Sequence, residues 1–250
     1  MTTIYIIISF IIGTSLGSFF FLVGLGLPIG QKIVIKQSRC NQCTQQLSKK
    51  EIIPIVSYLI DGRKCQHCQR RISPVYVLVE CVTGWLFAYS FWKIGFNYEL
   101  IVIWLLISLL VIITVSDILY MVIPNKVLLF FLPLFIIGRI ISPLSLWWDS
   151  ILASILGFLI LFFIALISKG GMGGGDIKLF FLLGIILGVE KTILSLVLAA
   201  IIGLIISMFV LFFLKKERKT PIPFGPSIAL ATLIAYFYGE QIIESYMKLF

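Results

Sequence analysis

Long hydrophobic runs separated by short polar segments fill almost the whole chain. Most runs approach twenty residues, the length that an α-helix needs to cross a bilayer. The pattern therefore predicts an all-α polytopic membrane protein with about eight transmembrane helices. These helices are expected at residues 4–27, 75–93, 99–117, 125–142, 149–168, 177–189, 192–214 and 225–246.

The composition supports this fold class. Of the 250 residues, 60% are hydrophobic and only 12% are charged, which is too little polar surface for a soluble domain of this length. No lysine or arginine precedes the first hydrophobic run, as one would in a secretory signal peptide. We therefore expect a retained first helix whose N-terminus lies outside.

The distribution of basic residues agrees with that orientation. With the N-terminus outside, sixteen of the twenty lysines and arginines lie in cytoplasmic segments or at the inner ends of helices. This is the asymmetry that the positive-inside rule describes. Both termini are then outside. The net charge of +9 is explained by topology and anionic lipid, so no nucleic acid partner is expected.

One long polar segment, residues 28–74, separates the first helix from the rest. It predicts three parts: a first helix at 1–27, a cytoplasmic module at 28–74 and a seven-helix membrane domain at 75–250. The module carries two C-x2-C pairs, which can hold Zn²⁺ in a tetrahedral site. Disulfides rarely persist in the cytoplasm, and four protein ligands leave no open position, so a structural zinc is expected. The expected ligands are Cys40, Cys43, Cys65 and Cys68.

Two other residues near this module have alternative interpretations. His67 could replace one of the cysteine ligands, or it could be an exposed residue between the last two cysteines. Cys81 lies in the second predicted helix, where we expect it to be a buried small hydrophobic residue.

Two aspartates stand at the same predicted depth. Asp117 is at the inner end of the third helix, and Asp176 is at the inner start of the sixth. Two carboxyl groups held close share one proton, so one can activate a water while the other polarises a peptide carbonyl. Each also has a structural interpretation, because Asp117 could be a helix-end charge among headgroups and Asp176 could be an N-cap.

A glycine-rich segment leads into Asp176. The sequence "GGMGGGDIK" lacks the Lys-Ser or Lys-Thr of a phosphate-binding loop, and no strand is predicted before it. Glycines without side chains would instead let another backbone or a bound peptide approach Asp176. We expect this role for Gly173, Gly174 and Gly175.

Taken together, these motifs resemble the type IV prepilin peptidases, the G-x-G-D class of intramembrane aspartic proteases. The similarity covers nearly the whole chain. It rests on "GSF" at 17–19, the paired cysteine motifs, "DILYMVIPN" from Asp117 and "GMGGGDIKL" around Asp176. The compact, cysteine-bearing form is similar to the competence-type enzymes of Gram-positive bacteria.

The resemblance implies a specific activity. Such enzymes remove the short basic leader of prepilins and pseudopilins at the cytoplasmic face of the bacterial plasma membrane. They cut after a glycine, directly before the hydrophobic helix. By motif position, Asp117 and Asp176 would be catalytic, the four cysteines would bind zinc, and the three glycines with Lys178 would contact substrate.

The resemblance also bears on a second reaction. Many members methylate the new N-terminus, for which S-adenosylmethionine would be the cofactor. Glu80 matches an acidic position after the module that could serve the methyl-transfer or substrate amine site, or it could simply form a salt bridge. The chain departs from the family pattern in one place, since Phe21 and Gly26 stand where Asn and Arg are common.

Other classes of function use similar residues. A transporter or channel could use the same two aspartates as a proton or cation site. It would be expected to show internal repeats and a site at the membrane midplane, whereas these aspartates lie at the inner edge. A zinc-module adaptor without chemistry is the third alternative, and it predicts that both aspartates are dispensable.

Overall fold

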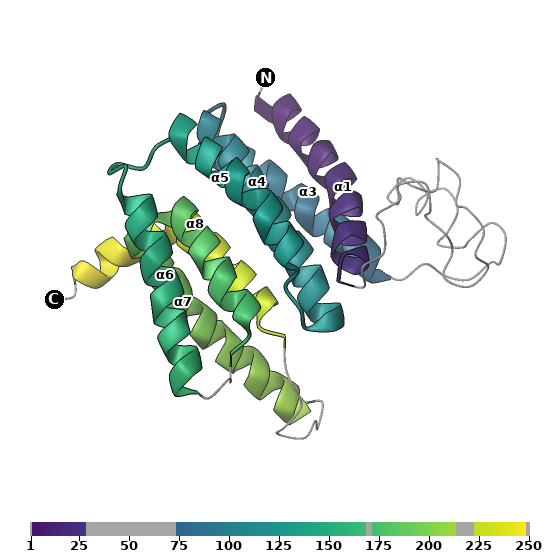
Figure 1. The fold of residues 1–250 in the computed structure, drawn as a ribbon. Helices are drawn as coiled ribbons and strands as arrows, with labels where there is room; N and C mark the ends of the chain where they lie inside the picture. The colour runs from purple at the N-terminus through teal and green to yellow at the C-terminus, as the bar shows by residue number, and fades with distance from the viewer. Residues whose placement is uncertain (1, 29–73, 169–171, 214–222, 249–250) are drawn as a thin grey trace, which may run out of the picture. The chain divides into compact units, whose positions relative to one another are not determined.

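The protein is described by a computed structural model that covers residues 2–28, 74–168, 172–213 and 223–248 (Figure 1). Within these ranges the chain forms seven helices and no strand. The four cysteines of the predicted zinc module, His67 and Lys169 lie outside the described residues. The helices are α1 (Thr2–Gly26), α3 (Pro74–Ile94), α4 (Tyr98–Tyr120), α5 (Asn125–Ile141), α6 (Asp149–Ile167), α7 (Gly174–Phe213) and α8 (Gly225–Met247).

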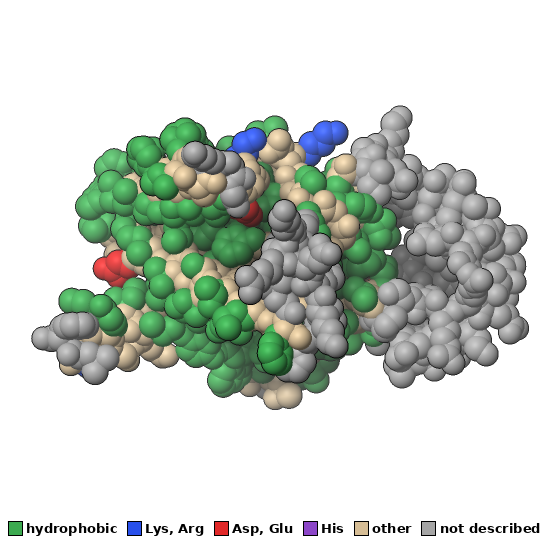
Figure 2. Space-filling view, turned by 90° about the horizontal axis from the view of Figure 1, so that it is seen from below, with side chains coloured by type: hydrophobic (Ala, Val, Ile, Leu, Met, Phe, Trp, Pro, Cys, Tyr) green, Lys and Arg blue, Asp and Glu red, His purple; other side chains and the backbone are tan. Residues whose placement is uncertain are grey.

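Five of the described helices are long and apolar enough to cross a membrane, namely α1, α3, α4, α6 and α7. Large hydrophobic side chains also cover much of the outer surface, as the face in Figure 2 shows. An outer surface of this kind fits lipid rather than water. The prediction of an all-helical membrane protein is confirmed in this form, while the number of eight spans stays a prediction.

The chain divides into two compact units, residues 1–100 and 101–250. In the first unit α1 and α3 run side by side (Figure 1). Their backbones approach closely because glycines occupy the interface. A Cβ on Gly13 would lie only 2.7 Å from the Cβ of Phe87. Small residues serve the same purpose in many membrane helix pairs.

In the second unit α5, α6 and α8 each pack against α7. The contact between α6 and α7 is again made by glycine, since a Cβ on Gly184 would lie 2.5 Å from the Cα of Ser154. The core of this unit is apolar and includes fully buried side chains of α4, α5 and α7, such as Ile103, Phe135 and Leu183.

Helix α7 is interrupted at Gly188, whose φ of 76° and ψ of 174° are not helical. That region of backbone space is essentially restricted to glycine. The groups freed by the break have charged partners. The Val189 amide donates to Asp149 Oδ1 at 3.2 Å, and the guanidinium of the buried Arg139 donates to the Ile186 carbonyl. Charged side chains thus stabilise a break inside a hydrophobic helix.

Three expectations need correction. The spans expected at 177–189 and 192–214 correspond to the two helical segments of α7 on either side of the Gly188 break, but the first begins earlier, at Gly174 inside the glycine-rich segment. Helix α4 continues to Tyr120, so Asp117 lies within its last turn rather than at its end. The prediction that Cys81 is buried was wrong, because its side chain is exposed. Hydropathy identifies a helix but does not tell which of its faces points outward.

Candidate active site

Asp117 lies in the last turn of α4 and is buried, with 7% of its surface exposed. Its Oδ2 accepts a hydrogen bond of 2.6 Å from the backbone amide of Gly225, the first residue of α8. The backbone of Phe224 also interacts with this carboxyl group. A carboxylate is well placed there, because the free amides at a helix N-terminus favour negative charge.

Gly225 is required by this arrangement. A Cβ on Gly225 would lie 2.8 Å from Oδ2 of Asp117 and 2.9 Å from its Cβ. Any side chain at this position would therefore displace the carboxyl group. Pro226 follows directly, and proline suits the first turn of a helix because its missing amide has no partner to lose there.

The turn after α4 packs against the start of α7, and so lies between the helix that carries Asp117 and the helix that carries Asp176. The backbone reverses at Met121, which has a φ of 54°, and the Ser116 hydroxyl donates to the Val122 carbonyl at 2.5 Å. Ile123 is then buried against the start of α7, where a Cβ on Gly175 would lie 2.8 Å from the Ile123 Cβ. The residue before Asp176 thus packs on the turn that follows Asp117.

Asp176 lies in the first turn of α7 and is half-buried. Its amide donates to the Gly173 carbonyl at 3.1 Å, and its carboxyl group interacts with the Gly173 backbone in return. The carboxyl group of the third helical residue thus reaches back to the N-cap, which is one half of a capping box. The alternative interpretation of Asp176 as a capping residue is therefore consistent with its geometry.

The carboxyl groups of Asp117 and Asp176 lie close enough to interact electrostatically. Neither forms an ion pair with a lysine or arginine in the part of the chain that the structure describes. Two partly buried carboxyl groups without a cation cannot both ionise easily, so they are suited to sharing one proton. The structure thus brings together the two aspartates that the sequence analysis singled out.

The three glycines differ in what surrounds them. Gly173 faces the Asp176 carboxyl group, since a Cβ there would lie 3.1 Å from Oδ2, and Gly175 faces Ile123. A Cβ on Gly174 would meet no atom of the described residues within 4 Å. The space beside Gly173 and Gly175 is therefore occupied by other side chains of this protein, whereas the space beside Gly174 is open.

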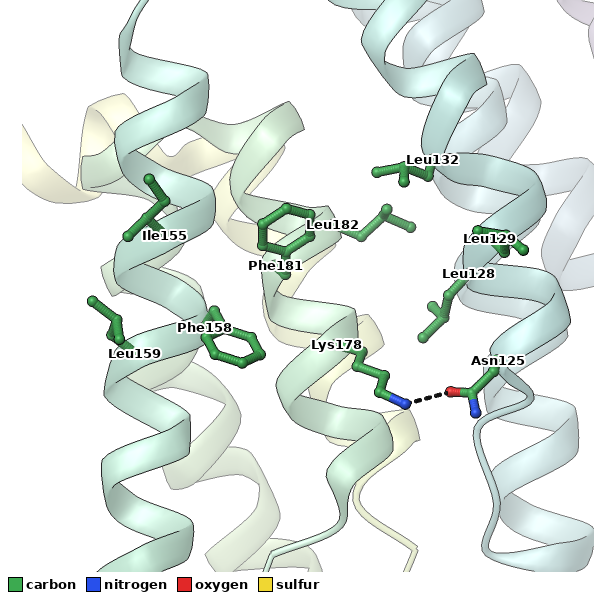
Figure 3. Close-up of a pocket in the computed structure, with 10 residues that line it drawn as sticks. All are labelled: Asn125, Leu128, Leu129, Leu132, Ile155, Phe158, Leu159, Lys178, Phe181 and Leu182. Atoms are coloured by element: carbon green, nitrogen blue, oxygen red, sulfur yellow. Dashed lines mark hydrogen bonds between the residues drawn. The ribbon is translucent and has the colours of Figure 1, made fainter.

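Lys178 is bound to a side chain of α5. Its ammonium group donates to Asn125 Oδ1 on α5 at 3.0 Å, and the side chain is exposed (Figure 3). Any contact of Lys178 with a substrate therefore takes place beside α5.

Two family models match the chain. The model of the bacterial peptidase A24 N-terminal domain matches residues 11–94, and that of the type IV leader peptidase family matches residues 104–208. The prepilin leader peptidase/N-methyltransferase of Bacillus subtilis is 40% identical over 97% of this chain and 98% of its own. The chain belongs to this peptidase family. It is therefore an enzyme, and the family resemblance is confirmed.

More distant relatives carry the same name. The prepilin leader peptidase/N-methyltransferases of Stutzerimonas stutzeri and Pseudomonas aeruginosa are each 32% identical over 86% of this chain and 76% of their own. No solved structure gave a significant match.

Glu80 of the peptidase lies in the first unit, between α1 and α3. It is 1% exposed, and its Oε1 accepts a hydrogen bond from the Ser18 hydroxyl. Its Oε2 has no hydrogen-bond partner among the described residues. The partner that the structure shows is thus a hydroxyl group, and a role in methyl transfer stays a prediction.

Sequence reasoning missed Gly225 and Ile123. A signal for Gly225 was present, because "FGPS" marks a helix start on the same predicted side of the membrane as Asp117. No comparable signal marks Ile123, which is one of many isoleucines.

Proposed function

We propose that this peptidase is an intramembrane aspartic endopeptidase that removes the basic leader of type IV prepilins or pseudopilins. Cleavage follows a glycine at the cytoplasmic face, with the predicted module on the same side and both termini outside. The names of the relatives support the substrate class. The observation that carries the mechanism is the electrostatic interaction of Asp117 with Asp176, with no ion-paired lysine or arginine at either residue in the described ranges.

In the proposed reaction the pair holds one proton. The ionised carboxylate takes a proton from a water, whose oxygen attacks the scissile carbonyl carbon. The protonated partner meanwhile donates its proton to the carbonyl oxygen. Collapse of the tetrahedral intermediate breaks the C–N bond, and the amine leaves with the proton taken from water. A hydroxyl proton of the intermediate returns to the other carboxylate, so the pair again holds one proton. The titration belongs to the pair rather than to either residue.

The position of the pair along the helices supports cleavage just inside the cytoplasmic boundary of the hydrophobic layer. Charged side chains mark the other end of the second unit. They are Asp149, beside Gly188, and the exposed Lys191–Glu240 ion pair, whose charged atoms are 2.7 Å apart. Asp176 precedes Gly188 by twelve residues, and Gly225 precedes Glu240 by fifteen. At 1.5 Å per residue these segments are about 18 and 22 Å long, less than the roughly 30 Å hydrocarbon core.

We also propose a structural zinc ion bound by Cys40, Cys43, Cys65 and Cys68. Two C-x2-C pairs supply the four thiolates of a closed tetrahedral site. A segment of this length has little core of its own, so the metal would contribute much of its folding free energy. Metal analysis of the purified protein should find about one zinc per chain, and a zinc-free preparation would contradict this.

The relatives are also named N-methyltransferases, and we extend the proposal to this reaction. S-adenosylmethionine would supply the methyl group to the amine that cleavage releases. Mass spectrometry of the mature pilin N-terminus tests the proposal, because an unmethylated terminus made by active enzyme and donor would contradict it. No observation favours the transporter alternative, since the relatives are peptidases.

Replacement of either aspartate by asparagine tests the central proposal. Asparagine keeps the size and hydrogen bonding of the side chain but cannot share a proton. We expect D117N and D176N to lose leader cleavage at least 100-fold, as expected for loss of an acid–base group. Asp149→Asn, in the same unit but away from the pair, is the matched control. Normal cleavage by D117N or D176N would refute the mechanism.

A further inference from the structure

A hydrophobic groove of about 640 Å³ lies on the second unit, along α7 between α5 and α6 (Figure 3). Its walls include Leu129 of α5, Phe158 of α6 and Phe181 of α7. Among the described residues that line it, the polar ones are Lys178 and Asn125, which form their hydrogen bond at one end. The groove therefore has an apolar body and a single polar end.

The polar end lies at the level of the candidate active site. Asn125 follows the turn that packs on Gly175, and Lys178 follows Asp176 by two residues. Residues two apart are about 200° apart around a helix, so Lys178 and Asp176 occupy opposite faces of α7. A chain that joins the groove to the aspartates must pass the N-terminus of α7, where Gly174 leaves open space.

We propose that this groove binds two turns of the substrate's hydrophobic helix, which begin after a short extended stretch that follows the scissile bond. The extended stretch between the bond and the helix then passes Gly174. This proposal rests on the proposed function, because it assigns a location to a part of the same substrate.

The dimensions of the groove suit a short helical segment. Along α5 it runs from Asn125 to Leu132, and seven residues correspond to about 10 Å, or two helical turns. Two turns of an apolar helix would bury their side chains against leucine and phenylalanine there, in place of lipid.

The polar end favours a peptide over a lipid chain. Backbone groups that leave helical structure at membrane depth need hydrogen-bond partners from protein. The Lys178 ammonium carries three N–H groups and gives one to Asn125, and the Asn125 amide adds further donors. An acyl chain offers no polar backbone to this pair, whereas an unwound peptide does.

Photo-crosslinking tests the occupant directly. A photoreactive amino acid replaces Leu129, which is 71% exposed in the groove, or Phe130, which is 65% exposed next to it and outside the lining. Both variants carry D176N, are reconstituted in phosphatidylethanolamine–phosphatidylglycerol vesicles and receive a purified prepilin. We expect position 129 to crosslink to the first three turns after the scissile bond, and position 130 to lipid. Lipid adducts alone at 129, or equal substrate adducts at both positions, would overturn the proposal.

A kinetic arm uses catalytically intact protein. Leu129→Trp fills the groove from an exposed position, so kcat/KM for prepilin should fall about tenfold while the thermal midpoint stays unchanged. Phe130→Trp should remain within twofold of the unaltered enzyme. Normal cleavage by Leu129→Trp contradicts the groove proposal. Crosslinking does not require catalysis, so a D176N variant that still cleaves would overturn the aspartic mechanism without affecting the crosslinking result.

Discussion

At both ends of the first segment of α7, carboxyl groups interact with the backbone, but their other partners differ. At the Gly188 break, Asp149 accepts a hydrogen bond from a backbone amide and Arg139 donates one to a backbone carbonyl, so both charged groups bind the freed backbone. At the Gly174 end, Asp117 and Asp176 interact with each other and have backbone amides, but no cation among the described residues. The first arrangement stabilises a fold, and the second holds a proton-sharing pair.

The comparison explains why an acidic residue beside a glycine is ambiguous in a membrane protein. Both sites place a carboxyl group against a glycine that a Cβ would crowd. The difference lies in the second partner, which is a backbone amide at the break and another carboxyl group at the active site. Substitutions at the two ends should therefore separate effects on stability from effects on cleavage.

Among substitutions that keep both aspartates, the largest effect is expected at Gly225. Gly225→Ala would place a methyl group 2.8 Å from Asp117 Oδ2 and displace the carboxyl group. Since a shift of about 1 Å can lower a catalytic rate by roughly 100-fold, we expect a loss of that size in kcat. Prepilin cleavage on gels provides the measurement. Gly239→Ala lies on the same helix against the flexible Lys191 side chain and should stay within twofold. Equal activity of the two variants would show that Asp117 is not crowded.

At the break, the largest effect should appear in stability. Gly188→Ala imposes a backbone conformation that is strained by about 1–3 kcal/mol, and its methyl group would also collide with Asp149. The thermal midpoint in detergent should fall clearly, while kcat per folded molecule stays within a few-fold. A stable variant with no activity would mean that the break serves catalysis instead.

Substitution of Asp149, which accepts the hydrogen bond at the Gly188 break, should have a smaller effect on stability. Asp149→Ala leaves the Val189 amide without its acceptor, for which we expect a loss of about 1–2 kcal/mol. Asp149→Asn keeps an acceptor oxygen at the same place and should lose less than half of that. Thermal unfolding of both variants measures the difference, and identical midpoints would argue against a role for this hydrogen bond.

The smallest effect is expected for the Lys191–Glu240 ion pair. Its carboxylate side chain is 78% exposed, and exposed pairs contribute about 0–1 kcal/mol. Lys191→Gln should therefore change neither the thermal midpoint nor cleavage measurably. A large loss of stability would show that this ion pair contributes more to the free energy of unfolding than its exposure suggests.

The sequence predicted the helical membrane fold because hydropathy and length are local properties of each helix. It also predicted the same membrane depth for Asp117 and Asp176, because the distribution of lysine and arginine defines the orientation of every segment. It did not predict the partners of the Gly188 break, since Arg139 and Asp149 lie about 50 and 40 residues earlier in the chain. Packing also determined the exposed face of Cys81 and the distinct surroundings of Gly173, Gly174 and Gly175.

A double-mutant cycle on the two aspartates tests the central claim most directly. Cleavage rates of D117N, D176N and the double variant are measured on one prepilin, with thermal midpoints as a check on folding. If the residues act as one proton-sharing pair, each single variant should already fall to the rate of the double variant, because effects within such a unit are strongly non-additive. Independent losses that multiply in the double variant, or a single variant that cleaves normally, would contradict the account.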